Sequence, residues 1–290
     1  MIVRIVLALV LLGAPVSAAE RIISLAPSVT ETLFALGVGD RVVGVSTYCD
    51  YPAAATKIDH VGTFLQPNVE RILVKKPDLV IAVPSPGNQS PVERLQKLGI
   101  NVLVVNPERI AEILASIRSI ADAVGVPQKG FDLVARIERD LAAVEARLAD
   151  APRLRTLMLV GRAPLVAAGG GTYQGELIER AHGANIVSEI GQAWPHLSLE
   201  FVVARAPQVI IDASMGSEAD SYAGTAPAFW ADFPTIPAAR DKRIYGYRSY
   251  ELLRPGPRVA ETLATVARFI HPERFEVSER RSPEITDDPR

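Results

Sequence analysis

Cysteine is almost absent from the chain, whose 290 residues include only Cys49. One cysteine cannot form an intramolecular disulfide, so even in an oxidising compartment the hydrophobic core has to hold the fold together. Hydrophobic residues make up 48% of the sequence, which is enough for one large or two medium domains. The composition therefore excludes a small disulfide-stapled scaffold as well as a disordered or fibrous chain.

An excess of one charge is also lacking, since 31 basic and 33 acidic residues leave a formal net charge of −2. Proteins that bind nucleic acid need a basic surface that displaces counterions from the phosphates. We therefore expect no nucleic acid among the partners of this protein.

Clusters of metal-binding or catalytic residues are lacking as well. The four histidines share no metal-ligand spacing, and neither HxxxH nor CxxC occurs. We interpret His60, His182, His196 and His271 as ordinary surface or loop residues. Cys49 has no histidine nearby in sequence, so a catalytic thiol stays open only as an unsupported alternative. The sequence predicts no enzyme, no metal site and no resident cofactor.

Long apolar segments are limited to the start of the chain. Arg4 precedes an apolar run over residues 5–12, and the small residues Val16-Ser17-Ala18 follow. This order is typical of a secretory signal peptide, whereas a membrane-spanning helix needs about 20 apolar residues. We predict a signal peptide over residues 1–19, cleaved near Ala18 or Ala19. No cysteine stands at that point, so we expect a freely soluble periplasmic protein without a lipid anchor.

After this segment, short β-branched runs alternate with amphipathic helical stretches, which is typical of βα units on a mostly parallel sheet. Residues 28–31 (Ser-Val-Thr-Glu) predict a helix that opens with a capping box. The predicted N-terminal lobe covers residues 20–126. Its expected strands are 21–25, 42–45, 79–82 and 102–105, and its expected helices are about 69–75, 92–98 and 111–124.

One long helix is predicted over residues 127–150. Apolar residues recur there at three and four positions, which gives a single buried face on a helix roughly 35 Å long. They are Val134, Ile137, Leu141, Val144 and Leu148. Such a helix is either a surface helix of one continuous domain or a rigid linker between two lobes, and the next segment decides between these alternatives.

A second α/β series occupies residues 151–275 and repeats part of the first, and residues 276–290 are predicted to be a flexible tail. Residues 68–81 match residues 198–211, so that Glu200 follows Glu70 at an offset of 130 residues. In both copies a polar N-cap starts a short helix and a proline ends it before a buried strand. The N-caps are Asn68 and Ser198, and the prolines are Pro77 and Pro207. The predicted fold is α/β, with two Rossmann-like lobes joined by a single long α-helix and a ligand cleft between the lobes.

Aromatic residues are few, at 6% of the chain, and several stand on loops before helices. Phe64 and Trp194 each lie six residues before the repeated glutamate, and Tyr48, Tyr51 and Tyr250 are also on expected loops. Core packing is the alternative for each one, but aromatic side chains that face each other across a cleft suit a broad, mostly apolar ligand.

The run Gly169-Gly170-Gly171-Thr172 stands between an expected strand, 165–168, and an expected helix, 176–180. It lacks the lysine of a phosphate-binding P-loop and the GxGxxG spacing. Two interpretations stay open for it, a backbone-lined edge of the ligand cleft and a flexible turn.

Several segments occur in an order that a known family shares: 22–31, 43–52, 69–72, 76–81, Trp194-Pro195 with Glu200, and 254–258. Through them the sequence resembles the helical-backbone (class III) periplasmic binding proteins of ABC importers, over nearly all of the chain after the signal peptide. The resemblance implies two lobes linked by one helix, small opening motions, and a corrinoid such as cobalamin as the ligand.

The resemblance implies roles for particular residues. Tyr48, Phe64 and Trp194 would lie against the corrin ring, with Tyr48 near the cobalt face, and Tyr250 would join them in the cleft. Arg254 would stand at the cleft rim and meet ligand amides or phosphate. Haem or a ferric siderophore is the alternative ligand, because one fold can serve several ligands. A tyrosine such as Tyr48 can ligate haem iron.

The repeated glutamates have a simple local interpretation, because a carboxylate in the first turn of a helix is stabilised by the helix dipole. The resemblance implies a further role, in which Glu70 and Glu200 pair with arginines on the two permease subunits of an ABC importer. We expect the protein to act as a monomer that delivers its ligand to that permease.

Overall fold

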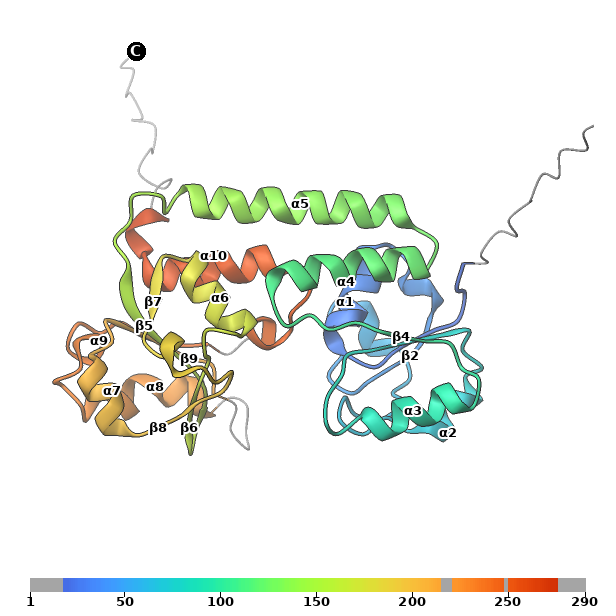
Figure 1. Cartoon of the computed structure of the whole chain (residues 1–290), viewed down its shortest axis with the longest axis horizontal. Helices are drawn as coiled ribbons and strands as arrows, with labels where there is room; N and C mark the ends of the chain where they lie inside the picture. The colour runs from blue at the N-terminus through green and yellow to red at the C-terminus, as the bar shows by residue number, and fades with distance from the viewer. Residues whose placement is uncertain (1–17, 215–220, 248–249, 276–290) are drawn as a thin grey trace, which may run out of the picture.

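The computed structural model describes residues 18–214, 221–247 and 250–275. The predicted tail and all but the last two residues of the predicted signal peptide lie outside them. Two α/β lobes stand side by side, and one long helix, α5 (Pro127–Ala146), lies across both (Figure 1). The two lobes and the single connecting helix confirm the predicted fold class.

The N-terminal lobe is built on a four-stranded sheet of order β2-β1-β3-β4, and every pair is parallel. Its central strands are buried on both faces, as expected for short β-branched runs covered by helices. The strands are β1 (Ile22–Ser24), β2 (Val42–Val45), β3 (Leu79–Ala82) and β4 (Val102–Val104). The helices are α1 (Pro27–Ala35), α2 (Val69–Val74), α3 (Gln89–Lys97) and α4 (Ile110–Ala123), with the 3-10 helices η1 (Gly39–Arg41) and η2 (Ala53–Lys57).

The start of α1 differs from the prediction of a capping box. The helix begins at Pro27, two residues earlier than expected, and its N-cap is Ala26, which makes no side-chain cap. Proline suits the first turn of a helix because it has no backbone N–H to satisfy. The carboxylate of Glu31 accepts hydrogen bonds from Arg258 and is therefore not a capping group.

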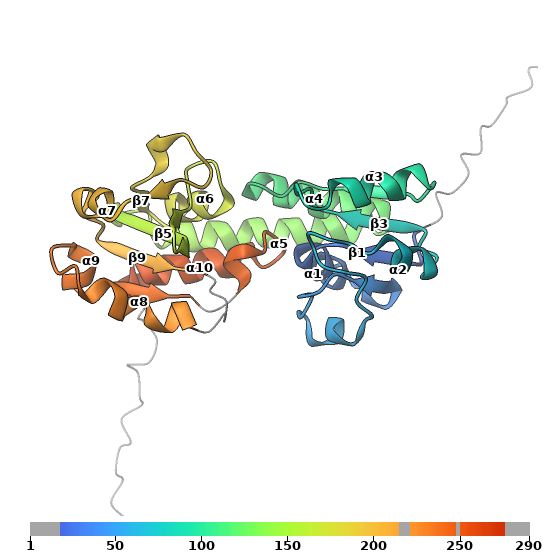
Figure 2. The same ribbon diagram turned by 90° about the horizontal axis from the view of Figure 1, so that it is seen from below.

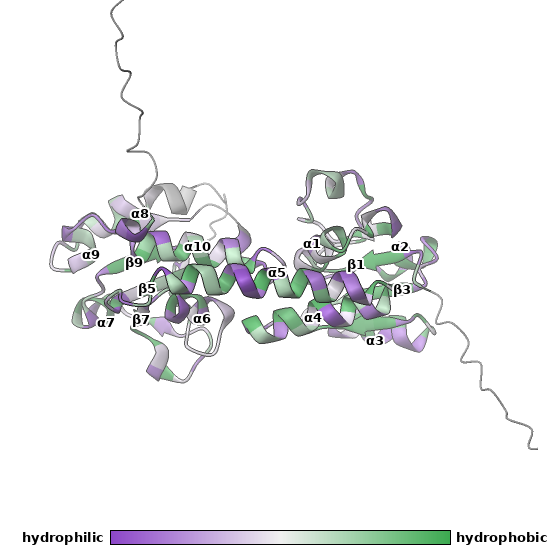
Figure 3. Ribbon diagram, turned by 90° about the horizontal axis from the view of Figure 1, so that it is seen from above, coloured by the Kyte–Doolittle hydropathy of each residue, from purple (hydrophilic) through white to green (hydrophobic). Residues whose placement is uncertain are grey.

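The linker helix α5 ends at Ala146, four residues before the expected end at Asp150. The chain turns there because Leu148 is fully buried and its carbonyl accepts a hydrogen bond from the Ala151 amide. The buried face of α5 includes the predicted apolar stripe from Val134 to Leu141. Hydrophilic residues are spread along its outer side, above both lobes (Figure 3).

The C-terminal lobe contains a six-stranded mixed sheet of order β10-β9-β5-β6-β8, with β7 paired to β5. The pairs of β6 with β5 and with β8 are antiparallel, which the expectation of a mostly parallel sheet did not include. The strands are β5 (Leu154–Arg162), β6 (Leu165–Ala167), β7 (Gly183–Asn185), β8 (His196–Leu197), β9 (Val209–Asp212) and β10 (Ile244–Gly246).

The helices of this lobe cover the sheet and lead the chain back toward the N-terminal lobe. They are α6 (Tyr173–Arg180), α7 (Leu199–Arg205), α8 (Ser221–Ala231), α9 (Pro237–Arg240) and α10 (Val259–Ile270), with η3 (Ser188–Ile190), η4 (Tyr250–Leu253) and η5 (Pro272–Arg274). Figure 2 shows α10 reaching from the C-terminal lobe toward α1. Besides the covalent link through α5, the lobes therefore meet again where the start of α10 approaches α1.

The internal repeat predicted from the sequence is confirmed at the level of single hydrogen bonds. Asn68 accepts a hydrogen bond from the Arg71 amide (2.8 Å), and Ser198 accepts one from the Phe201 amide (3.2 Å). Each helix is followed by a residue with positive φ before its proline, Lys76 at 47° and Ala206 at 46°. These two residues are also 130 positions apart. The left-handed conformation ends both helices in the same way.

The largest hydrophobic core is shared by the two lobes. It includes Leu33 from α1, Ile117 from α4, Ile137 from α5, Met158 from β5 and Leu263 from α10, all nearly inaccessible to solvent. Each lobe also has a smaller core of its own. Because the shared core follows α4, α5 and α10, the lobes are packed together along these helices as well as being linked in sequence.

Candidate ligand-binding site

A pocket of about 320 Å³ lies between the lobes. The N-terminal lobe contributes residues 83–84 and 106–108, which lie just after β3 and β4. The C-terminal lobe contributes residues 171–174, residues 193–194, Leu253 and Pro255. Parallel strands end at the same edge of a sheet, and ligands bind beyond that edge in α/β proteins. The geometry places a ligand site where the strands of the first lobe face the second.

Trp194 is the predicted aromatic residue that lines this pocket, and 45% of it is exposed. Its loop is fixed on both sides. The Gly169 amide donates to the Ala193 carbonyl (2.8 Å), and the Ala167 amide donates to the Pro195 carbonyl (3.0 Å). A Cβ on Gly169 would lie 1.9 Å from the carbonyl oxygen of Gln192, so only glycine permits this close approach.

The glycine-rich run also reaches the pocket. Gly171 lines it, and Thr172 caps α6 by accepting a hydrogen bond from the Gly175 amide (3.0 Å). This placement favours the first interpretation of the run, a backbone-lined edge of the cleft. Farther along α6, the Glu176 carboxylate accepts a hydrogen bond from the Ile110 amide (2.9 Å) at the start of α4. Glu176 thus connects the two lobes close to the pocket.

Arg254 lies between two residues of the pocket wall, yet its side chain is only 7% exposed. Its guanidinium donates to both carboxylate oxygens of Asp50 and to the Tyr48 carbonyl (2.9 Å). The Arg254 guanidinium holds the pKa of the Asp50 carboxyl below its ordinary value, chiefly by this hydrogen bonding. The structure therefore places Arg254 in contacts between the lobes, where the sequence predicted an accessible cleft rim.

A second arginine from the same segment enters the N-terminal lobe. Arg258 donates from Nε and Nη2 to the two oxygens of Glu31 (2.8 and 2.7 Å) and from Nη1 to Glu251 (2.7 Å). Its guanidinium also lies over the ring of Tyr51, 4.0 Å from the centroid. Glu31 is 3% exposed, and a carboxylate this deeply buried needs paired charge.

The other predicted aromatic residues lie outside the pocket lining or outside the described side chains. Tyr48 is 65% exposed on the loop that Arg254 holds. Phe64 is half-buried and packs against the shared core, while its carbonyl accepts a hydrogen bond from Asn88 (3.2 Å). Tyr250 begins η4, and its side chain is not among those described.

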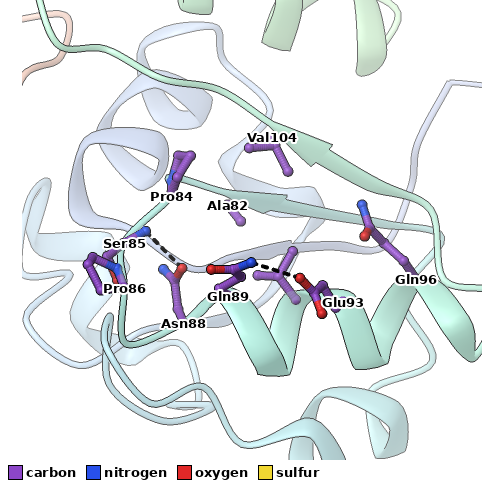
Figure 4. A pocket seen from close by; sticks show the side chains of 10 residues that line it. Ala82, Pro84, Ser85, Pro86, Asn88, Gln89, Glu93, Gln96 and Val104 are labelled. Carbon is purple, nitrogen blue, oxygen red and sulfur yellow. Dashed lines mark hydrogen bonds between the residues drawn. The ribbon is translucent and has the colours of Figure 1, made fainter.

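A second groove, of about 470 Å³, lies on the N-terminal lobe between α3 and the ends of β3 and β4 (Figure 4). Pro84 lines both this groove and the pocket between the lobes. Its α3 side carries amides and a carboxylate, and Gln89 donates to Glu93 (2.9 Å). Asn88 holds the groove's loop by accepting a hydrogen bond from the Ser85 amide (3.0 Å).

Sequence reasoning missed several of these positions. It did not single out residues 106–108 or Tyr173 and Gln174, although the rule that ligands bind at the carboxyl ends of strands points to the loop after β4. The contacts of Arg254 with Asp50 and of Arg258 with Glu31 had no local signal, since each joins residues more than 200 positions apart in the chain.

The repeated glutamates are both exposed in the first turns of their helices. Glu70 in α2 pairs with Arg94 (3.1 Å), and Glu200 in α7 has a lowered pKa because it accepts hydrogen bonds from its own amide and from Ser198. Figure 1 shows α2 and α7 on different lobes, on the side of the molecule away from α5. The structure thus leaves both carboxylates at the surface, one on each lobe.

Cys49 does not have the surroundings of a reactive thiol. It is 3% exposed, and burial raises the pKa of its thiol, against hydrogen bonding from Ser46 and Thr30. Among the described residues there is no group of three or more side chains suited to a metal ion. No helix in that part of the chain is long and apolar enough to cross a membrane.

The fold and the site together define a two-lobed binding protein, with a pocket between α/β lobes that are joined by a long helix. A family model for periplasmic binding proteins matches residues 22–251, and the chain belongs to that family. Its members are periplasmic proteins that bind a substrate and do not catalyse a reaction.

Similar proteins with known structures or names support the same assignment. The vitamin B12-binding protein of Yersinia pseudotuberculosis is 33% identical over 263 residues, covering 90% of this chain and 92% of the relative. The periplasmic vitamin B12 binding protein BtuF of Vibrio cholerae has a TM-score of 0.77 at 26% identity and covers 90% of this chain and 99% of its own. The periplasmic heme-binding protein RhuT from Roseiflexus sp. RS-1 has the same TM-score at 28% identity, covering 88% and 99%. The chain is a periplasmic binding protein of the BtuF type.

Proposed function

We propose that this protein captures cobalamin or a related corrinoid in the periplasm and delivers it to an ABC importer. The observation that carries the proposal is the 33% identity, across 90% of the chain, to a vitamin B12-binding protein. The pocket between the lobes is consistent with it, because Trp194 presents a large aromatic surface beside the backbone of residue 171. A flat macrocycle is bound mainly through buried area and stacking of this kind.

The ligand side chains would extend beyond the pocket between the lobes. Pro84 separates that pocket from the groove beside α3, where Gln89 and Gln96 stand. Amide side chains can both donate and accept hydrogen bonds, as the amide-bearing periphery of a corrinoid requires. We place Tyr48, Phe64 and Tyr250 around the same ligand as predicted contacts.

Haem is the alternative ligand, and two observations favour keeping it. RhuT, a heme-binding protein, has a TM-score of 0.77 with this chain at 28% identity. Tyr48 is 65% exposed on the loop that Arg254 holds, and a tyrosine oxygen can ligate haem iron. A ferric siderophore belongs to the same alternative, because one fold serves several ligands.

Titration of the purified protein without residues 1–19 tests the proposal. Calorimetry and visible absorption would follow binding of cyanocobalamin and, separately, of haemin. We expect one-to-one binding of cyanocobalamin that is at least about 100-fold tighter than binding of haemin, which corresponds to about 2.7 kcal/mol. The reverse order would move the ligand to haem, and binding of neither would contradict both proposals.

For delivery, we propose that Glu70 and Glu200 contact basic residues on the two permease subunits. The repeat gives the two lobes equivalent exposed carboxylates, which suits a partner with approximate twofold symmetry. Rim charges of this kind affect orientation and association rate more than ligand affinity. Export by the predicted signal peptide would bring the protein to the same compartment.

The double substitution Glu70→Ala with Glu200→Ala should leave corrinoid affinity unchanged and reduce transport about tenfold, because the docking charges act outside the ligand site. Transport would be measured as corrinoid uptake by cells that carry the variant and its permease. Glu138→Ala with Glu145→Ala, on α5 away from α2 and α7, is the matched control for loss of two negative charges. Normal uptake by the first variant would rule out the docking role.

A further inference from the structure

The loop of residues 47–52 belongs to the N-terminal lobe but is held by two arginines of the C-terminal lobe. Arg254 binds the Asp50 carboxylate with two nitrogen atoms and donates to the Tyr48 carbonyl (2.9 Å). Arg258 lies over the Tyr51 ring, 4.0 Å from its centroid. Three neighbouring positions of one loop are therefore fixed from the opposite lobe.

The backbone of Tyr48 requires such support. Its φ is 73°, in the left-handed region that a bulky residue with a Cβ adopts only with backbone strain. A strained residue keeps this conformation when its surroundings fix it, and the hydrogen bond to its carbonyl is one such constraint. The strained residue is also the exposed aromatic that we place beside the ligand.

Arg254 is poorly placed to bind the ligand directly. Its side chain is 7% exposed, and Asp50, Tyr48 and, at 3.6 Å, Glu31 surround its guanidinium. Its neighbours Leu253 and Pro255 do line the pocket. The arginine thus lies behind the pocket wall and connects that wall to the Tyr48 loop.

We propose that Arg254 is a positioning residue, which acts on ligand binding by holding Tyr48 in its strained conformation beside the pocket between the lobes. This inference rests on the proposed function only in taking Tyr48 as a ligand contact. Asp50 takes part in this positioning, because its carboxylate fixes the Arg254 guanidinium in the orientation that reaches the Tyr48 carbonyl.

Direct ligand binding by Arg254 and positioning by Arg254 predict opposite effects of Asp50→Ala. If Arg254 met the ligand itself, removal of Asp50 would free its guanidinium, and affinity would stay the same or rise. If Arg254 positions Tyr48, Asp50→Ala lowers affinity by about tenfold, as does Arg254→Ala, and the double variant loses little more than either one.

Introducing Arg254→Ala into the Tyr48→Ala variant tests whether Arg254 acts through Tyr48 or supports the fold in general. Once Tyr48 is removed, Arg254→Ala should change affinity less than about twofold, because the residue through which it acts is gone. Calorimetry with cyanocobalamin would measure these values, or with haemin if the wild-type protein prefers it. A loss of about tenfold from Arg254→Ala in the Tyr48→Ala background would overturn the proposal.

A measurement without ligand keeps this test independent of the proposed function. Hydrogen–deuterium exchange of the ligand-free protein should show faster exchange over residues 47–52 in Arg254→Ala and in Asp50→Ala than in the wild type. Arg240→Ala is the matched control, since Arg240 forms an exposed two-nitrogen pair with Asp241 in the other lobe. Unchanged exchange over the loop in both test variants would overturn the proposal even if the protein binds cyanocobalamin.

Discussion

At the scale of the residue, Trp194 offers the clearest test of the ligand site, because it is half exposed within the pocket and its loop is fixed by two backbone hydrogen bonds. We expect Trp194→Ala to weaken corrinoid binding by about tenfold to a hundredfold, since it removes the stacking surface without disturbing the core. Calorimetric titration with cyanocobalamin measures this change.

Phe131→Ala is the control for the loss of an exposed aromatic side chain, because Phe131 is 62% exposed on α5 and does not line the pocket. That variant should bind as the wild type does. An affinity within about twofold of the wild type for Trp194→Ala would show that stacking on this residue contributes little.

The ion pair of Asp50 with Arg254 makes the stability of the folded protein depend on pH. Its pKa in the folded protein lies below the ordinary value of 3.8, first because Arg254 donates a hydrogen bond to it. A lowered pKa means that the pair stabilises the folded state at any pH above the ordinary value and that this contribution is lost as the pH falls through the folded pKa. The melting temperature of the wild type should therefore exceed that of Asp50→Asn by a constant amount at neutral pH.

The same difference should shrink below pH about 4 and vanish at lower pH, when Asp50 becomes protonated in the folded protein. Calorimetric scans of the two proteins across this range measure it. A difference that persists undiminished at pH about 2 would mean that the charge of Asp50 contributes nothing to stability.

Local sequence patterns predicted where a residue stands on its own element, and they did not predict its contacts with distant elements. Trp194 was expected on a cleft loop because its place before the repeated helix is visible in the sequence, and it lines the pocket. Arg254 was placed at the cleft rim by the family resemblance, and nothing near it in sequence shows that Asp50 meets its guanidinium. The partners of buried charges are set by tertiary packing, which periodicity does not report.

At the scale of the element, the contact between α4 and α5 depends on a glycine. A Cβ on Gly130 would lie 2.4 Å from the Cβ of Ala121 on α4, which is far inside van der Waals contact. We expect Gly130→Val to lower the free energy of unfolding by about 2 kcal/mol, because the helices have to move apart. Denaturant unfolding measures the loss.

Ala142→Val is the control, since Ala142 is exposed on the same helix and the substitution introduces the same β-branched side chain. Its effect should stay within about 0.5 kcal/mol. Equal stability of Gly130→Val and the wild type would mean that α4 and α5 are not closely packed at this point.

The first or last residue of a helix was predictable where a local signal such as an N-cap sets it. It was not predictable where tertiary packing sets it. The caps Asn68 and Ser198 were read from the sequence and are present. The end of α5 was placed four residues too late, because the apolar period continues through Leu148 while the backbone already turns to bury that side chain. In α1, the carboxylate of Glu31 was assigned to a cap although it pairs with Arg258.

At the scale of the whole molecule, the lobes are joined by a shared core along α4, α5 and α10 and by polar contacts besides those of Arg254. Glu176 reaches the start of α4 from the C-terminal lobe, and Arg258 reaches Glu31. The two-lobed α/β fold was predictable, since the repeat and the long helix are visible in the sequence. The second connection was not, because it joins residues 227 positions apart.

The pair of Glu31 and Arg258 tests how far this connection stabilises the whole protein. The side chain of Glu31 is 2% exposed and that of Arg258 is 14% exposed, so neither charge is hydrated well enough to stand alone. We expect Arg258→Ala to lower the free energy of unfolding by about 3 kcal/mol, because it leaves a buried carboxylate without its main partner. Calorimetric and denaturant unfolding measure the change.

Replacement of both members should be much less damaging than replacement of one. In Glu31→Met with Arg258→Met, neither member of the pair is left as a buried charge without its partner and the volume is nearly kept, so we expect most of the lost stability to return. Arg240→Ala, which breaks an exposed pair, should lower the free energy of unfolding much less than Arg258→Ala does, because solvent screens exposed pairs. If Arg258→Ala proved as mild as that control, the packing of α10 against α5, and not the ion pair, would be what keeps the lobes together.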